Sequence, residues 1–157
     1  MYHKILVPLD GSKLAECVLP HVLTLAKGCE VKDIVLLRVC QPPVILADYP
    51  PSIHVPFEEN VEKLNTFSLQ QCSLYLGDME KKLKEQGLAV KFESRLGNAA
   101  EEIVDFAEKN GVDLIVMASH GRSGPSKWAF GSVAEKVLRM TCVPVMLVRA
   151  PGCVPGI

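Results

Sequence analysis

Short apolar runs alternate along this sequence with longer segments in which apolar residues recur every three or four positions. The runs are Lys4–Leu9, Asp33–Val39, Ala89–Ser94, Leu114–Ala118 and Pro144–Val148. Runs of this length, rich in Val, Ile and Leu, predict β-strands, and the spacing between them predicts amphipathic helices. Strands that alternate with helices are typical of an α/β protein built from repeated βα units around a parallel sheet.

One of the predicted strands has a different pattern from the others. The other runs are continuously apolar, as expected where helices cover both faces of a parallel sheet. In Ala89–Ser94, however, Val90 and Phe92 alternate with Lys91 and Glu93. Such alternation indicates one wet face, so we expect this strand at an edge of the sheet.

The helical segments carry their own start and stop signals. The first runs from Leu14 to about Gly28, and Pro20 within it predicts a kink or a late start. A long amphipathic helix is predicted from about Glu58 to Gln86.

Two later helices begin with a capping pattern. Asn98 has Glu101 three residues after it, and Ser132 has Glu135 in the same place. A small polar residue followed by Glu at this spacing is typical of a helix N-terminus. We therefore expect Asn98 and Ser132 to cap their helices.

A proline-rich segment interrupts the alternation. Five prolines lie in Gln41–Pro56, which excludes a helix and predicts a loop insertion over residues 41–57. Long loops in compact domains are often lids or binding surfaces, but a flexible insertion explains the pattern equally well. Both interpretations stay open.

Length and charge narrow the class of protein. The 157 residues predict a single domain, residues 1–150, with a flexible tail, residues 151–157. Seventeen Lys and Arg against eighteen Asp and Glu leave a net charge of −1, without the basic footprint of a nucleic-acid binder. The apolar stretches are far shorter than the roughly 20 residues of a membrane span. No secretory signal precedes the first strand, so we expect a cytoplasmic protein.

The cysteines do not form a recognisable metal or redox motif. They are spaced singly, without a C-x-x-C pair, and mostly in apolar surroundings. We interpret them as small buried hydrophobic residues in a reducing compartment. They are Cys17, Cys29, Cys40, Cys72, Cys142 and Cys153.

Candidate chemistry follows the fourth strand. The segment Ala118–Gly124 leads toward Gly131 and Ser132 at the start of the last helix. A loop between a parallel strand and a helix N-terminus offers backbone N–H groups and the positive end of the helix dipole, and glycines allow close approach. This arrangement favours an anion such as phosphate, although such a loop is also an ordinary connection. The P-loop, dinucleotide, hydrolase and zinc-protease signatures are absent from the sequence.

Several motifs together resemble one family. Gly121, nine residues and then Gly131-Ser132 resemble the second half of the G-x2-G-x9-G-[ST] nucleotide loop of universal stress proteins. Ile5–Ser12, Gly97–Ile103 and Val143–Val148 are also similar to that family. One position departs from the pattern, because Ala118 stands where the family has the first glycine. A strand-end position in β conformation tolerates alanine, whereas one with positive φ would not.

The resemblance implies a three-layer, doubly wound, five-stranded parallel sheet of order 3-2-1-4-5, the adenine nucleotide alpha-hydrolase-like fold. ATP, AMP or ADP, with Mg²⁺ as a candidate companion, would bind where the strand order reverses. Ser132 either caps its helix or contacts phosphate, and His120 is either a phosphate contact or an ordinary loop residue. The implied nucleotide contacts are Pro8, Leu9, Asp10, Val39, Met117, Ala118, His120, Gly121, Gly131, Ser132 and Val133.

The leading hypothesis is an ATP- or AMP-binding regulatory or signalling protein of the stress response. A nucleotide-free dimeric scaffold is the alternative that Ala118 keeps open. A slow ATPase or autophosphorylating protein is a further alternative, but no pair of nucleophile and base is evident from the sequence. Because Val143–Val148 would lie at a sheet edge, we also expect a homodimer through this strand.

Overall fold

The computed structural model describes residues 2–41, 57–120 and 130–149, with side chains from residue 60 onward in the second segment. Its strands form one five-stranded parallel sheet in the order β3-β2-β1-β4-β5, which confirms the predicted order. The strands are β1 Lys4–Pro8, β2 Asp33–Cys40, β3 Val90–Leu96, β4 Leu114–Ala118 and β5 Val145–Val148.

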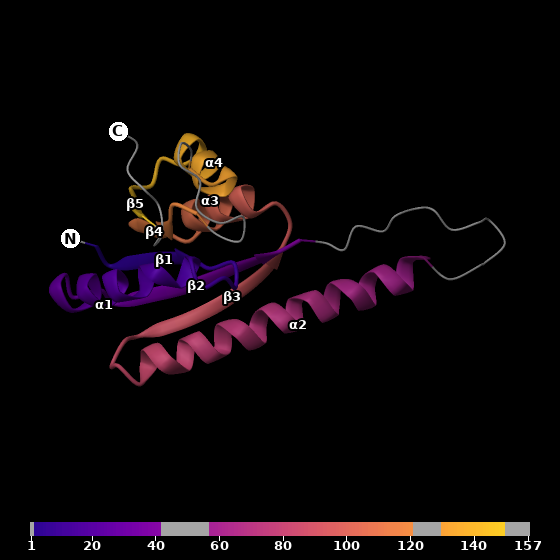
Figure 1. Cartoon of the computed structure of the whole chain (residues 1–157), viewed down its shortest axis with the longest axis horizontal. Helices are drawn as coiled ribbons and strands as arrows, with labels where there is room; N and C mark the ends of the chain where they lie inside the picture. The colour runs from indigo at the N-terminus through magenta and orange to yellow at the C-terminus, as the bar shows by residue number, and fades with distance from the viewer. Residues whose placement is uncertain (1, 42–56, 121–129, 150–157) are drawn as a thin grey trace.

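Helices cover both faces of this sheet and give the molecule three layers (Figure 1). α1 and α2 lie on one face, and α3 and α4 lie on the other. None of the described helices is long and apolar enough to cross a bilayer. The helices are α1 Leu19–Gly28, α2 Phe57–Lys84, α3 Ala99–Lys109 and α4 Ser132–Met140, and a short 3₁₀-helix, Ala15–Val18, precedes α1.

The core is divided in two by the sheet, because neighbouring residues of a strand point to opposite faces. In β1, Ile5 and Val7 pack toward α1 and α2, and Leu6 packs toward α3 and α4. All three side chains are fully buried. The continuous apolar runs of the sequence therefore have the physical cause that was expected of a two-sided sheet.

The edge strands also agree with the sequence pattern. β3 pairs only with β2 in the described sheet, and Lys91 on it is exposed.

Pro20 falls in the first turn of α1. An N–H at that position has no partner within the helix, so the lack of one in proline costs nothing. The late start predicted from Pro20 is confirmed.

The two predicted N-caps have different outcomes. The Oδ1 of Asn98 accepts hydrogen bonds from the N–H groups of Ala100, at 3.2 Å, and Glu101, at 3.5 Å, so Asn98 is the N-cap of α3. The prediction for Ser132 is wrong, since the N-cap of α4 is Gly131 and Ser132 is the first helical residue. Among the described residues, no side chain caps this helix start. Instead, the backbone N–H of Gly131 donates to the carbonyl of Ser119 at 2.8 Å.

The interpretation of the cysteines is also wrong in part. Cys40 and Cys72 are buried, as expected, but they are joined in a disulfide. Cys142 is exposed, and Cys153 lies outside the described residues. Sequence spacing gave no sign of the pair because 31 residues separate the two positions and only the packing of α2 on β2 brings them together.

Candidate functional site

A pocket of about 230 Å³ opens at the carboxyl ends of the strands, where the chain turns to one face after β1 and to the other after β4. In open α/β sheets this reversal leaves a crevice in which ligands bind. The pocket is lined by Pro8, Leu9, Asp10, Ala15, Leu37, Val39, Gln41, Ala99, Ile103, Met117, Ala118, Ser119, His120, Gly131, Ser132, Val133 and Ala134.

This lining contains every residue that the resemblance assigned to the nucleotide except Gly121, which lies outside the described residues. Residues 122–129, in the segment between β4 and α4, lie outside them as well. Seven further lining residues, from the helices, from β2 and from the positions just after β2 and β4, were not among the expected nucleotide contacts. These are Ala15, Leu37, Gln41, Ala99, Ile103, Ser119 and Ala134.

One side of the pocket is an apolar wall. Leu37 and Val39 of β2, Met117 of β4 and Ile103 of α3 are all at least 92% buried. Ala118 ends β4 as a strand residue, and it is not among the described residues with positive φ. Alanine therefore fits this position without backbone strain, as the sequence analysis expected for a strand end.

The loop after β1 is held by its own polar side chains. Asp10 Oδ1 accepts a hydrogen bond from the N–H of Ser12 at 2.8 Å, and Ser12 Oγ accepts one from the N–H of Ala15 at 3.1 Å. Side chains that bond the backbone two or three residues on stabilise tight turns and helix starts. These bonds hold Asp10 at the edge of the pocket, with one carboxylate oxygen bonded to the backbone of the loop after β1.

Gly11 in this loop is required by its conformation and by its neighbour. Its φ is +86°, and a Cβ placed on it would lie 2.8 Å from the Nη2 of Arg38. The Arg38 guanidinium lies over the ring of Tyr75, 4.9 Å from its centre, and the Tyr75 hydroxyl donates to Glu16 at 3.2 Å. Burial, together with the carboxylate of Glu16, raises the pKa of Tyr75 above its usual range.

The residues after β4 form the polar floor of the pocket. Ser119 and His120 are the buried polar residues of the described core, at 4% and 7% exposure. The N–H of Ser119 donates to the carbonyl of Val148 at 2.7 Å, and its Oγ lies 3.1 Å from Nδ1 of His120. A hydroxyl thus lies beside a ring nitrogen, a pair that was not evident from the sequence.

Gly131 closes the floor against α4. Its N–H donates to the Ser119 carbonyl at 2.8 Å, and a Cβ on it would lie only 3.2 Å from that oxygen. Its φ is −57°, so glycine serves close approach here rather than a left-handed backbone. The first residues of α4, Ser132, Val133 and Ala134, line the pocket, and N–H groups at a helix N-terminus have no partner within the helix.

The charges of the described lining are few. Asp10 is its only acid, and it contains no Lys or Arg. An anion in this pocket would be held mainly by backbone N–H groups and the dipole of α4, each of which favours negative charge at a helix N-terminus. No cluster of His, Cys, Asp and Glu able to hold a metal ion exists among the described residues.

Comparison with known proteins agrees with this geometry. Residues 1–149 match the universal stress protein family. Universal stress protein MJ0531 of Methanocaldococcus jannaschii is 31% identical over 151 residues, covering 96% of this chain and 84% of the relative. The solved structure of MJ0577, from the same organism, is 32% identical with a TM-score of 0.83, covering 97% of this chain and 99% of that one. A universal stress protein in complex with cAMP shares the fold at 17% identity and a TM-score of 0.57, over 94% of this chain and 97% of that one.

The sheet order, the helices on both faces and the crevice at the strand reversal define the adenine nucleotide alpha-hydrolase-like fold. The chain belongs to the universal stress protein family.

The Gly11 turn generates a testable prediction. In Gly11→Ala the added methyl meets both a positive φ and the Arg38 guanidinium, so the free energy of unfolding should fall by about 1–2 kcal/mol. Gly28→Ala is the matched control because nothing lies within 4 Å of its Cβ position. At the end of a helix it should be neutral or stabilise by about 0.5–1 kcal/mol. Urea unfolding measures both, and equal stability of the two variants would contradict the requirement for glycine at position 11.

Proposed function

We propose that this protein binds an adenine nucleotide, ATP or AMP/ADP, and acts as a regulatory or signalling protein of the stress response in the cytoplasm. The observation that carries the proposal is the position of the α4 N-terminus, held against the end of β4 by the Gly131–Ser119 hydrogen bond and open to the pocket. The structural neighbour in complex with cAMP and the loop resemblance support the same class of ligand.

The chemistry of the lining matches the parts of a nucleotide. A flat apolar base fits between walls such as Val39 and Met117, which are 8% and 5% exposed. The Asp10 carboxylate is an acceptor at the pocket edge, which suits a ribose hydroxyl or Mg²⁺. Phosphates suit the N–H groups that begin with Ser132 and Val133. With Ser132 not acting as the N-cap, its hydroxyl is available in this proposal as a phosphate contact.

The alternatives have weaker support. A nucleotide-free dimeric scaffold rested on Ala118, but alanine fits the strand conformation there. The contact of 3.1 Å between Ser119 Oγ and His120 Nδ1 is the observation that favours a slow ATPase or autophosphorylating protein. Phosphoryl transfer also needs cationic and acidic groups around the phosphates, and the described lining supplies Asp10 alone. We therefore propose binding without fast turnover.

ATP binding should be measurable as stabilisation. At one hundred times Kd, a ligand adds about 2.7 kcal/mol, which raises Tm by roughly 5–10 °C for a domain of this size. Trp128 is the only tryptophan and lies between β4 and α4 in the sequence, so its fluorescence gives a second readout. If neither Tm nor fluorescence changes at millimolar ATP, the binding proposal is wrong.

Gly131→Val tests where ATP binds. A larger side chain at 3.2 Å from the Ser119 carbonyl must displace the start of α4, so ATP affinity should fall at least tenfold while circular dichroism stays close to that of the parent. Gly28→Ala should retain the parent affinity. Parent affinity in a folded Gly131→Val variant would show that the loop is misassigned.

We also propose a homodimer through Val143–Val148. β5 is an edge strand, and β4 uses the carbonyls of Pro144 and Val148. Because successive residues of a strand face opposite sides, the backbone groups of Val145 and Leu147 point away from the sheet. Such an edge invites pairing with a second copy across a two-fold axis.

Sedimentation tests the dimer. The parent protein should sediment as a dimer at micromolar concentration. Leu147→Pro removes an outward N–H that would donate a hydrogen bond to a carbonyl of the partner strand. It should therefore shift the population to monomer. A thermal melt checks that the variant folds. A monomeric parent at micromolar concentration would contradict the proposed interface.

A further inference from the structure

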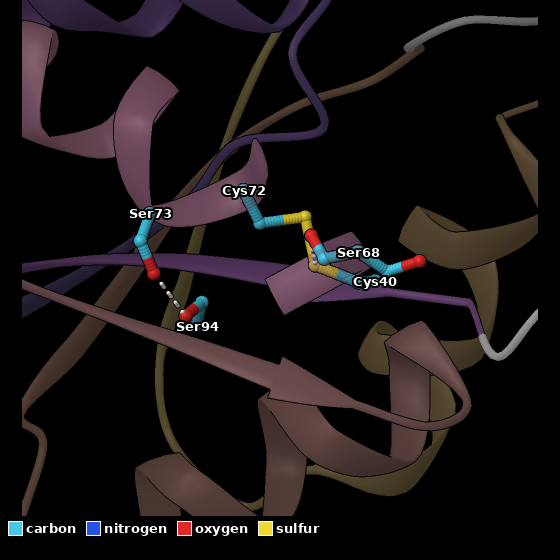
Figure 2. Close-up of a disulfide and its surroundings, with 5 residues drawn as sticks. All are labelled: Cys40, Ser68, Cys72, Ser73 and Ser94. Atoms are coloured by element: carbon cyan, nitrogen blue, oxygen red, sulfur yellow. Dashed lines mark hydrogen bonds between the residues drawn. A yellow bond between two sulfur atoms is a disulfide. The ribbon is translucent and has the colours of Figure 1, made fainter. Parts of the chain in front are cut away.

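Cys40 and Cys72 join two elements that the chain otherwise connects only through residues 41–56. Cys40 is the last residue of β2, and Cys72 lies in the middle of α2. Their Cα atoms are 6.7 Å apart, within the range of protein disulfides. The two side chains are 6% and 5% exposed. Figure 2 shows the disulfide crossing the space between the helix and the strand.

Other contacts also join α2 to the neighbouring strands beside the disulfide. Cys40 Sγ lies 3.6 Å from the carbonyl oxygen of Ser68 on α2. Beside Cys72, the hydroxyls of Ser73 and Ser94 are 2.8 Å apart and link α2 to β3 (Figure 2). Because α2 contacts the strands through these groups as well as through the S–S bond, we expect the fold to persist when the bond is reduced.

The disulfide shares the end of β2 with the pocket. Val39 and Gln41, on either side of Cys40, both line the pocket. Because side chains alternate along a strand, Cys40 points toward α2 while Val39 points to the opposite face. The Cys40 carbonyl accepts a hydrogen bond from the N–H of Gly97, just after β3, at 3.1 Å. A bond at Cys40 thus restrains the strand segment that carries the apolar pocket wall.

We propose that Cys40 and Cys72 are a reversible dithiol–disulfide site that takes a small peroxide as oxidant, and that its oxidation tightens nucleotide binding in the neighbouring pocket. The second part rests on the proposed function. In the dithiol form the end of β2 keeps more freedom, which nucleotide binding must remove. In the disulfide form this ordering has already occurred, and preorganised sites bind more tightly.

The chemistry is a two-electron exchange. One cysteine thiolate attacks a peroxide oxygen, the O–O bond breaks, and a sulfenic acid and one water form. The second thiol attacks the sulfenic sulfur, the S–S bond forms, and a second water leaves. Hydrogen peroxide is thus reduced to two waters, while two thiols are oxidised to one disulfide. A reducing dithiol returns both electrons and both protons by exchange through a mixed disulfide.

The position of the pair explains why oxidation selects it. Cys29 and Cys142 are thiols without a disulfide partner among the described residues. A sulfenic acid formed at Cys40 or Cys72, in contrast, has a second sulfur in place. In a cytoplasmic protein such a disulfide is expected to be transient and redox-sensing rather than permanent. The burial of both sulfurs favours a small peroxide over a bulky disulfide as the oxidant.

The test compares the full chain after dithiothreitol and after hydrogen peroxide. Each sample is denatured in N-ethylmaleimide, and intact mass is followed by peptide mapping. The chain has six cysteines, so the oxidised form should take up two fewer maleimides and yield a Cys40–Cys72 linked peptide that dithiothreitol removes. Oxidation should raise Tm by roughly 5–15 °C because the bond closes a long loop. ATP affinity should rise about threefold or more.

Three variants separate the effects. Cys40→Ser and Cys72→Ser should each lose the linked peptide, the Tm shift and the change in affinity, and Cys142→Ser, at an exposed thiol, should keep all three. If either serine variant does not fold, the parent compared in its two redox states gives the same three readouts. Absence of the linked peptide after peroxide, or a link that dithiothreitol does not remove, would overturn the site. A reversible link with equal ATP affinity in both states would overturn the coupling.

Failure of the proposed function has a different signature. In that case ATP binds in neither redox state, so the proposed coupling between oxidation and ATP affinity is wrong as well. The linked peptide and the Tm shift then still decide whether the dithiol–disulfide site exists.

Discussion

The reversal of strand order between β1 and β4 is the constraint on which the site depends. Because the chain leaves these neighbouring strands toward opposite faces, no helix covers the sheet edge between them, and a crevice remains. The loop after β1 supplies Asp10, and the loop after β4 leads to α4. The Gly131–Ser119 hydrogen bond of 2.8 Å then brings the N-terminus of α4 against the end of β4. The topology thus delivers an acceptor, an apolar wall and a row of N–H groups to one place.

The nearly neutral charge of the chain is consistent with such a site. Formal charge does not include backbone N–H groups or a helix dipole, although both attract anions at α4. The apolar wall depends on the two-sided burial of the sheet, since Val39 belongs to the same packed face as Leu37 and Met117. Cys40, the next residue, belongs to the opposite face with α2. The end of β2 therefore contributes to both the pocket wall and the disulfide, and this shared position is the physical basis of the coupling that we propose.

Local sequence predicted the features that have local causes. The apolar runs predicted the strands, Pro20 predicted the late start of α1, and Asn98 predicted a cap that its own side chain makes. Features that depend on tertiary contact were not predictable. Ser132 fits the capping pattern, but close packing on Ser119 makes Gly131 the N-cap. Likewise, the Cys40–Cys72 pair and the Arg38 guanidinium beside Gly11 arise from elements brought together by the fold. The lining residues that come from helix starts were missed for the same reason.

The proposed function requires that the pocket at the strand reversal hold an adenine nucleotide. The most direct measurement is mass spectrometry of the small molecules that freshly purified protein releases on denaturation, with Gly131→Val purified in parallel. We expect ATP, ADP or AMP in a substantial molar ratio to the parent protein and little from the variant. If the parent releases no adenine nucleotide and also takes up no added ATP before denaturation, the pocket does not hold one.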